Sequence, residues 1–293
     1  TNPSSVNLSA ANFPASGSIN SYLINLFSGI ITVGTNPGDD FPSLTNNGGL
    51  FEAINNAALS GNVIAEITTD LILETGTHAL NQWNEVGAGN YNLTIRPNNN
   101  ITKVISGTYA GTTIVNAGLY RFNGADRVTI DGRDPSNIPA GGKHLLFRNL
   151  NTANSVFNAT INLVNDAQNN TFQYSIIEGA TTNSTNGVFR ISTALGGGAG
   201  NDNLLIDHCN IRDLSNTTGL PVNTIYALGT TGFENSNVTM SNNEIFNFWN
   251  AATSGNGIFV STGNTSWNIN NNSLYQTNTQ TGAGAIVRYS IQV

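Results

Sequence analysis

Apolar residues recur along the second half of the chain in a short pattern that copies itself. Each copy has an apolar residue, two intervening residues, a small or amide residue, one further residue and a closing apolar residue. The first apolar positions are Phe172, Ile206, Met240 and Ile269, and the closing positions are Ile177, Ile211, Ile245 and Leu274. The closing positions stand 34, 34 and 29 residues apart. A near-constant period of this size indicates one supersecondary unit stacked on itself.

The unit predicts a short strand, a sharp corner and a second short strand. Its small or amide position holds Ser175, Cys209, Asn243 and Asn272. Asparagine tolerates the left-handed backbone conformation, so we place the corner here. One such unit cannot bury its inner face, whereas stacked copies can.

A second series of strand-like runs interleaves with the first. Its equivalent apolar residues are Ile161, Phe189, Ile225 and Ile258, at steps of 28, 36 and 33 residues. Both series therefore share a coil of roughly thirty residues.

The first half of the chain predicts a cap followed by more short strands. Leu50, Phe51, Ile54 and Leu59 fall near helical spacing and form the one convincing helix. A strand, a turn and this helix ahead of a repeat array are typical of a cap that hides the first open coil. Strand-like runs follow at 63–67, 70–73, 91–95, 103–105, 113–115, 120–122, 127–130 and 145–147.

These elements predict an all-β fold, a right-handed parallel β-helix with a short N-terminal capping helix. A doubly wound sheet needs a crossover helix for each strand, and none is readable. An antiparallel sandwich stays open as an alternative, although it does not explain a fixed amide position in successive units. Right-handedness is the default for parallel connections. We divide the chain into an extended segment or linker, 1–28, and a β-helix, 29–293.

Composition and net charge narrow the classes of molecule that this chain is expected to bind. Only 9% of residues are charged, against about 25% in average proteins, and the formal net charge is −7. An acidic chain without basic patches is not expected to bind nucleic acid. The sequence has no run of about 20 apolar residues, so we expect no direct membrane insertion. A signal peptide is not readable either, which suggests a processed or trimmed chain.

Known chemical motifs are missing from the sequence. The single cysteine, Cys209, excludes an intramolecular disulfide and is interpreted as a small buried residue. His78 and His144 lack the spacing of metal-binding motifs, and no calcium-binding loop occurs. We therefore expect no metal and no cofactor.

Four stretches are similar to a known family. They are Phe41 to Asn55 (FPSLTNNGGLFEAIN), Ala79 to Pro97 (ALNQWNE followed by YNLTIRP), Arg121 to Gly132 (RFNGADRVTIDG) and Leu145 to Thr152 (LLFRNLNT). They resemble the pectin-lyase-like, right-handed β-helix regions of large secreted surface proteins of Bacteroidetes-type bacteria, which leave the cell by type IX secretion.

The resemblance extends over about residues 29 to 293. Its motifs are specific to this family in the cap, whereas the coils would resemble those of any pectin-lyase-like β-helix. It implies secretion, surface display, adhesion or glycan contact, with the secretion machinery as a partner during export. It supplies no catalytic residues. The family carries a C-terminal sorting domain that is not visible here, so we expect this chain to be a segment of a longer polypeptide.

Two outward columns are the candidate binding residues. The position after the closing apolar residue reads Glu178, Arg212, Phe246 and Tyr275, and the second series offers Asn162, Arg190, Tyr226 and Phe259. Arginine stacked on aromatic rings makes a surface on which sugar rings can lie. An ordinary ladder that protects the sheet is the alternative interpretation. Trp249 would enlarge the first surface.

Catalysis has only weak candidates, Asp131 and Asp207. With Ile206 inward, Asp207 points outward, and its neighbours on adjacent coils are Gln173, Ser241 and Asn270. Asp131 would extend this column with at least one coil between the two carboxylates. A hydrolytic pair across several ångströms is conceivable. The segment Ile206 to His208 superficially resembles part of a pectate lyase, but lacks the preceding tryptophan, and His208 is interpreted as a polar corner residue.

The sequence thus predicts a non-catalytic module of a secreted cell-surface protein, acting as an adhesin or glycan-contacting stalk. A polysaccharide lyase or hydrolase on the same fold is the first alternative, and a purely structural spacer is the second.

Overall fold

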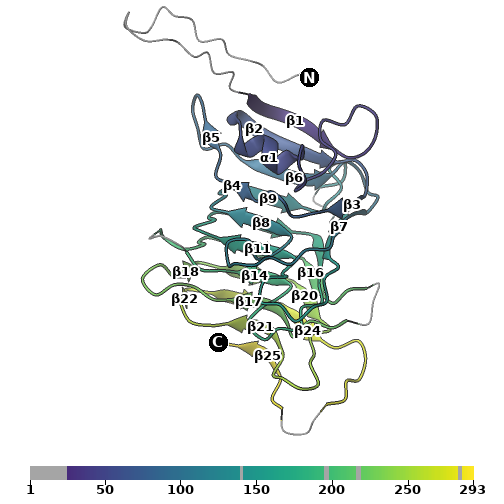
Figure 1. Cartoon of the computed structure of the whole chain (residues 1–293), viewed down its shortest axis with the longest axis vertical. Coiled ribbons are helices and arrows are strands. Elements are labelled where there is room, and N and C mark those ends of the chain that lie inside the picture. The colour runs from purple at the N-terminus through teal and green to yellow at the C-terminus, as the bar shows by residue number, and fades with distance from the viewer. Residues whose placement is uncertain (1–24, 139–140, 195–197, 216–218, 283–285) are drawn as a thin grey trace, which may run out of the picture.

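The chain winds into a parallel β-helix, which the computed structural model describes for residues 25–138, 141–194, 198–215, 219–282 and 286–293 (Figure 1). Every strand pairing between named strands is parallel, and strands distant in sequence lie side by side in three long sheets. One turn of the chain through these sheets is called a coil below. The predicted fold class is confirmed.

The first sheet runs along one side of the solenoid. Its strands are β1 (Leu26–Val33), β2 (Ala58–Ile67), β6 (Leu93–Pro97), β9 (Val128–Asp131), β12 (Thr171–Gln173), β15 (Leu205–Asp207), β19 (Thr239–Ser241) and β23 (Asn268–Asn270), with β5 (Asn84–Glu85) beside β2.

The second sheet holds β3 (Leu71–Glu74), β7 (Lys103–Gly107), β10 (Leu145–Asn149), β13 (Ser175–Glu178), β16 (Asn210–Arg212), β20 (Glu244–Phe246) and β24 (Ser273–Tyr275). The third holds β4 (Leu80–Asn81), β8 (Tyr120–Asn123), β11 (Ile161–Val164), β14 (Phe189–Ile191), β17 (Asn223–Ala227), β21 (Asn256–Val260) and β25 (Tyr289–Gln292). A small pair, β18 (Asn235–Ser236) and β22 (Asn264–Thr265), lies at a corner.

The predicted register of both repeat series is confirmed. Phe172, Ile206, Met240 and Ile269 are successive partners in the first sheet. The closing residues pair in the second sheet, and the second series pairs in the third. Because strand side chains alternate, each series places one apolar residue per coil in the interior, where stacked copies make a continuous core.

The corner differs by one residue from the prediction. The left-handed residues are Tyr174, His208, Asn242 and Asn271, with φ between 49° and 57°. The following residue, predicted to be the corner, instead turns inward, so that Ser175, Cys209 and Asn243 are buried. The left-handed residue turns the chain from the first sheet into the second and interrupts the in–out alternation, so the side chain after it faces the core.

Asparagine amides form ladders inside the corners. Asn243 Nδ2 donates to Asn272 Oδ1 at 2.8 Å, and the backbone N–H of Cys209 donates to Asn243 Oδ1 at 2.8 Å. A second ladder joins Asn201, Asn235 and Asn264. These bonds satisfy backbone groups that the corners remove from the sheet pairing.

The predicted helix is confirmed, although it is shorter than expected. Helix α1 spans Leu50–Asn55, and Leu59 belongs to strand β2. Leu50, Phe51 and Ile54 are buried under the first coil, and α1 packs against β4 and β2. The helix therefore closes the N-terminal end of the core, as a solenoid cap should.

Two further expectations need correction or fall partly outside the described residues. The run 113–115 is a turn, because Asn116 Oδ1 accepts the N–H groups of Thr112 and Thr113 at 2.8 and 2.6 Å. The segment 1–28 lies outside the described residues except for 25–28, and β1 already begins there at Leu26. No helix of the described residues is long and apolar enough to cross a membrane.

Candidate functional site

The predicted column on the second sheet forms in the expected order. Glu178 pairs with Arg212 across β13 and β16, and Phe246 pairs with Tyr275 across β20 and β24. The Arg212 guanidinium carbon lies 5.4 Å from the Phe246 ring centre. The Phe246 and Tyr275 rings stack at 4.8 Å with 9° between their planes.

The column begins one strand earlier than the sequence suggested, at Arg148 of β10. Arg148 Nε lies 2.6 Å from one carboxylate oxygen of Glu178, and Arg212 Nη2 lies 2.7 Å from the other. The Glu178 side chain is fully buried between these two cations. Both of its charge interactions are internal, so Glu178 has no oxygen free for a ligand.

The stacked rings present their edges to solvent. A spacing of 4.8 Å between the ring centres matches the distance of about 4.8 Å between neighbouring strands. The ring faces are therefore directed along the solenoid axis and cover each other. Phe246 is only 7% exposed. The flat open platform expected from the sequence is not formed, and Tyr275, on the last described strand of the sheet, is 39% exposed.

The second column also has the predicted register but is covered. Asn162, Arg190 and Tyr226 are successive partners on the third sheet, followed by Phe259. Asn162, Arg190 and Tyr226 are buried, whereas Phe259 is partly exposed. Arg190 donates to the carbonyl of Val156, in a loop that crosses the outside of the sheet.

The side chains of this column pack against one another rather than toward solvent. The Arg190 guanidinium carbon lies 5.9 Å from the Tyr226 ring centre, and Tyr226 meets Phe259 edge to face at 5.4 Å. Burial raises the pKa of Tyr226, although the charge of Arg190 opposes the rise. We conclude that loops close over this column and leave only Phe259 accessible.

Trp249 is partly exposed and is already stacked. The guanidinium carbon of Arg288 lies 3.8 Å from its ring centre, so one face of the indole is covered. Arg288 Nη2 also donates to the carbonyl of Asn250 at 2.7 Å, which fixes the cation over the ring.

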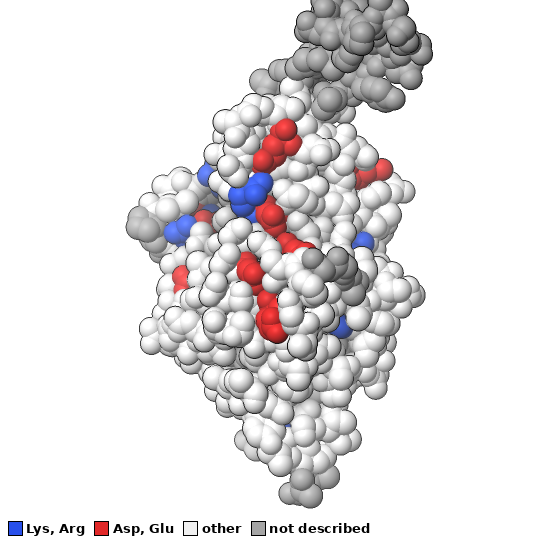
Figure 2. Space-filling model, turned by 90° about the vertical axis from the view of Figure 1, so that its left-hand side faces the viewer, with Lys and Arg blue, Asp and Glu red and all other residues white. Residues whose placement is uncertain are grey.

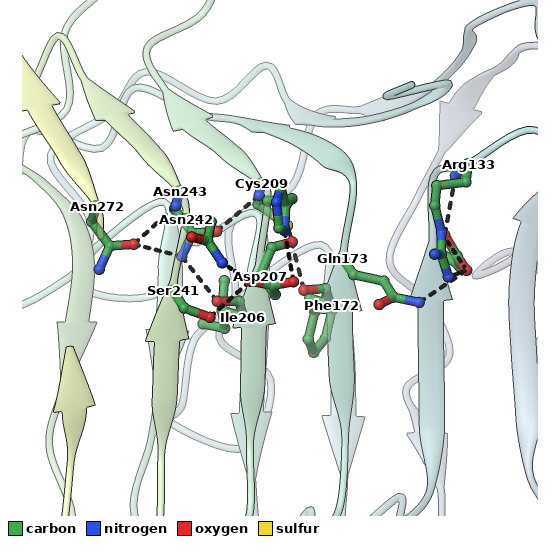
Figure 3. Close-up of polar contacts among 12 residues, drawn as sticks. Arg133, Phe172, Gln173, Ile206, Asp207, Cys209, Ser241, Asn242, Asn243 and Asn272 are labelled. Carbon is green, nitrogen blue, oxygen red and sulfur yellow. Dashed lines mark hydrogen bonds and ion pairs between the residues drawn. The ribbon is translucent and has the colours of Figure 1, made fainter. Parts of the chain in front are cut away.

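Asp131 and Asp207 lie in one outward column of the first sheet, as predicted. Gln173 of β12 separates them, pairing with Asp131 on one side and Asp207 on the other. Two strand spacings of about 4.8 Å place their backbones roughly 10 Å apart. Figure 3 shows the contacts of this column crossing from strand to strand.

Each carboxylate is already occupied by neighbours. Asp131 makes a two-point ion pair with Arg133, at 2.9 and 2.6 Å, and accepts Gln173 Nε2 at 2.9 Å. Asp207 accepts Ser241 Oγ at 2.7 Å and Asn242 Nδ2 at 2.9 Å, and lies 2.7 Å from His208 Nδ1.

These contacts decide the protonation state of Asp207. Burial alone raises its pKa, but hydrogen bonds from Asn242, Ser241 and His208 outweigh that effect and hold the pKa below the ordinary aspartate value. A glycosidase pair needs one carboxyl group that keeps its proton near neutral pH. Asp207 is ionised there, and Asp131 is clamped by a guanidinium. Asp207 therefore does not supply the general acid of such a pair.

A stacked column at the left-handed corner was missed by the sequence reasoning. The Arg133 guanidinium carbon lies 4.9 Å from the Tyr174 ring centre, and the Tyr174 and His208 rings stack at 4.6 Å with 7° between planes. The readable signal was the equivalence of Tyr174 and His208 in neighbouring repeats. Arg133 lies beyond β9, where the repeat pattern is not readable, and gave no signal.

The described residues hold no group of three or more His, Cys, Asp or Glu side chains placed to bind a metal ion. The Cys209 thiol is buried, and burial raises its pKa to about 12. A thiol with this pKa stays protonated, so it is neither a ready nucleophile nor a ready metal ligand.

Fold and surface define the chain as a parallel β-helical solenoid whose outward columns are stabilised by their own contacts. In comparisons with known proteins, no protein-family model matches the chain, and neither a curated protein nor a solved structure shows significant similarity.

Proposed function

We propose that this chain is a non-catalytic β-helical module of a secreted cell-surface protein, a rigid stalk that contacts polysaccharide or cell-surface glycan. The observation that carries the proposal is the pairing of chemically active groups inside the columns. Glu178 is held by two arginines, and Asp131 and Asp207 are fully engaged with neighbours. Charges used in this way stiffen the solenoid, and these three carboxylates are held by their neighbours.

The surface composition supports contact with neutral glycans. The chain exposes amides and hydroxyl groups with few charges, and most of the face in Figure 2 is neither acidic nor basic. Such groups hydrogen-bond sugar hydroxyls without desolvating an ion. Of the predicted binding residues, Tyr275, Arg212, Phe259 and Trp249 keep solvent exposure, and Tyr275 is the most exposed of them. We place the glycan contact at Tyr275, with Arg212 two strands away in the same column.

Retention on immobilised polysaccharides tests the glycan contact. Tyr275→Ala should weaken retention on the polysaccharide that binds, because the exposed aromatic ring is lost, while the melting temperature changes little. Tyr289→Ala, at the same 39% exposure on the third sheet, is the matched control and should be retained like the wild type. Equal retention of the Tyr275 variant and the wild type would reject this site. Phe246→Ala is unsuitable, since Phe246 is buried and its loss costs about 3 kcal/mol.

The leading alternative is a polysaccharide hydrolase or lyase, favoured by Asp131 and Asp207 lying in one column. Incubation with a polysaccharide panel distinguishes it. We expect neither new reducing ends nor unsaturated products. Products that vanish in Asp207→Asn would replace the binding proposal with the enzyme. Failure of every glycan to bind, without turnover, would favour the structural spacer.

Export belongs to the same proposal. A secreted module contacts the secretion machinery during export, and the family resemblance of the cap points to type IX secretion. Fractionation of a producing cell tests this, with the chain expected outside the cell; recovery in the cytoplasm would reject it.

A further inference from the structure

Strand β3 of the second sheet contains a bulge that turns two consecutive apolar side chains outward. Leu71 and Glu74, three positions apart, pair with residues of β7 that are only two positions apart, so two residues of β3 stand opposite one of β7. The bulge leaves Leu71 and Glu74 buried, whereas Ile72 and Leu73 are 60% and 78% exposed. Bulges re-aim side chains in this way and are specific features of a fold.

The buried Glu74 accounts for the bulge but not for the residues within it. Its carboxylate accepts the backbone N–H groups of Leu44 and Thr45 at 2.8 and 2.7 Å and so holds the cap loop. This contact requires an inward carboxylate and places no demand on the two outward side chains, where polar residues would serve equally well. Adjacent large apolar residues with a polar rim are typical of an interaction surface.

A groove of about 460 Å³ lies against Ile72 and Leu73. It is built on the flank of the solenoid, where β3 lies next to β7 (Figure 1). The Asn46 side chain donates to the carbonyl of Leu73 at 2.9 Å and accepts the N–H of Thr75 at 2.7 Å, which ties the cap loop to β3. The groove is therefore formed before any partner arrives. Polar and cap residues complete its lining, namely Thr35, Pro42, Ser43, Asn46 and Asp70.

The net charge of the molecule is concentrated at this end of the chain. Seven of the 17 Asp and Glu residues precede residue 96, whereas none of the 10 Lys and Arg residues does. The rest of the chain carries equal numbers of both signs, so the whole net charge of −7 lies in the part that builds the cap and the first coils. A partner that approaches the cap meets a negative field.

Three carboxylates beside the groove have no basic partner. Asp70 lines the groove, and Asp39 and Asp40 belong to the turn between two further lining residues, Thr35 and Pro42. Each of the three carboxylates accepts a hydrogen bond of 2.8 Å from a hydroxyl or backbone N–H group. Within the described part of the chain, none of them forms an ion pair. Their negative charge is not neutralised inside the molecule.

We propose that this groove binds a segment of another polypeptide in which apolar side chains are flanked by lysine or arginine. The apolar side chains cover Ile72 and Leu73, and the basic ones face Asp70, Asp39 and Asp40. A second copy of this chain is a poor occupant, because its cap carries the same negative charge and no Lys or Arg precedes residue 96. An anionic membrane surface is repelled for the same reason.

Fluorescence anisotropy with labelled peptides tests the proposal with no polysaccharide present, so the result is independent of the glycan contact. The probe is Lys-Lys-Gly-Leu-Leu-Gly-Lys-Lys. Two control peptides carry Glu in place of each Lys, or Ser in place of each Leu. We expect the probe to bind the whole chain at least about tenfold more tightly than either control, because one control reverses the charge and the other removes the apolar contact.

Leu73→Ser removes the most exposed apolar side chain of the groove and should raise the dissociation constant of the probe about tenfold, without changing the melting temperature. Asp70→Asn keeps an acceptor for the Val104 N–H but removes the charge. It should weaken binding at low ionic strength and have no effect at about 1 M salt, where charges are screened within about 3 Å.

Ile30→Ser is the matched control, because Ile30 is 57% exposed at the same acidic end but lies on β1 of the first sheet. It should bind the probe like the wild type. Equal losses in Ile30→Ser and Leu73→Ser, or no loss in Leu73→Ser, overturn the assignment to this groove. Absence of probe binding overturns the proposal, as does equal binding of all three peptides. Self-association of the wild type that Leu73→Ser abolishes would make a second copy the occupant instead.

Discussion

Asparagine has two different roles at neighbouring positions of the corner. Asn242 adopts the left-handed conformation with its side chain outside, whereas Asn243 is buried and hydrogen-bonds between coils. In the preceding coil the same positions hold His208 and Cys209. The outer position requires a residue that tolerates a positive φ. The inner position requires either a small side chain or an amide that hydrogen-bonds the backbone groups of the corner.

Removing the inner amide should be costly. Asn243→Ala deletes the acceptor of the Cys209 N–H and the donors to the Ile206 carbonyl and to Asn272 Oδ1. Buried groups left without a partner cost about 1–3 kcal/mol each, so we expect a loss of about 3 kcal/mol in the free energy of unfolding. Chemical denaturation measures it.

The control for this change is Asn154→Ala, whose exposed side chain accepts one surface hydrogen bond from Asn183. It should cost less than about 0.5 kcal/mol. Similar losses for the two variants would show that the inner ladder is not a source of stability.

Among the elements, strands β10, β13 and β16 are joined by the buried Glu178 between Arg148 and Arg212. Glu178→Gln leaves both guanidinium groups, which are 13% and 24% exposed, without their counter-charge. We expect a loss of about 3 kcal/mol. Glu66→Gln breaks the more exposed pair with Arg96 at 2.6 Å and should cost no more than about 1 kcal/mol. Parallel melting curves compare the two, and equal losses would contradict the role given to burial.

The cap supplies a pH-dependent contribution to stability. Burial raises the pKa of Glu74 above its ordinary value of 4.5, and hydrogen bonds from Thr45 and Leu44 offset only part of the rise. A folded-state pKa above the unfolded value means that the native state binds the proton more tightly. The contribution of Glu74 is therefore most favourable below the unfolded pKa and is lost as pH rises through the folded pKa.

Glu74→Gln tests this contribution. Relative to the variant, the wild type should lose unfolding free energy as pH rises from about 4.5 through the folded pKa of Glu74. Denaturation at a series of pH values measures the difference between the two proteins. A difference that stays constant, or one that grows in favour of the wild type with rising pH, contradicts the direction of the shift.

For the whole molecule, the two ends of the solenoid are unequal. The N-terminal core is closed by Leu50, Phe51 and Ile54 of α1, whereas the last coil keeps open edges and a partly exposed core. Solenoid stability is a sum over coils and their neighbours, so a coil with one neighbour is the weakest.

Hydrogen exchange should show this asymmetry. Amides of β23, β24 and β25 in this chain are expected to exchange first, those of β12 to β16 last, and those under α1 at intermediate rates. Uniform exchange along the solenoid would show that the molecule opens as one unit and that its ends are equivalent.

Much of this architecture could be predicted from the sequence, because the interior of a stacked repeat is local information. The period of Ile177, Ile211 and Ile245, together with strand alternation, determines the register, the inward series and the order of the outward columns. The same logic placed Asp131 and Asp207 in one column with Gln173 between them. It could not place Arg133 against Tyr174, because Arg133 lies past a strand end, outside any periodic pattern.

By itself, then, the sequence determined the parallel β-helix, its helical cap and which side chains stack on which. Only the tertiary structure decided what those stacks expose. The loop that holds Val156 covers Arg190, Tyr226 is buried, and stacking along the axis directs ring faces toward neighbouring coils. Periodicity shows which face of a strand a side chain occupies. Whether that side chain reaches solvent depends on the loops that pack over the face, and the path of a loop has no periodic signal in the sequence.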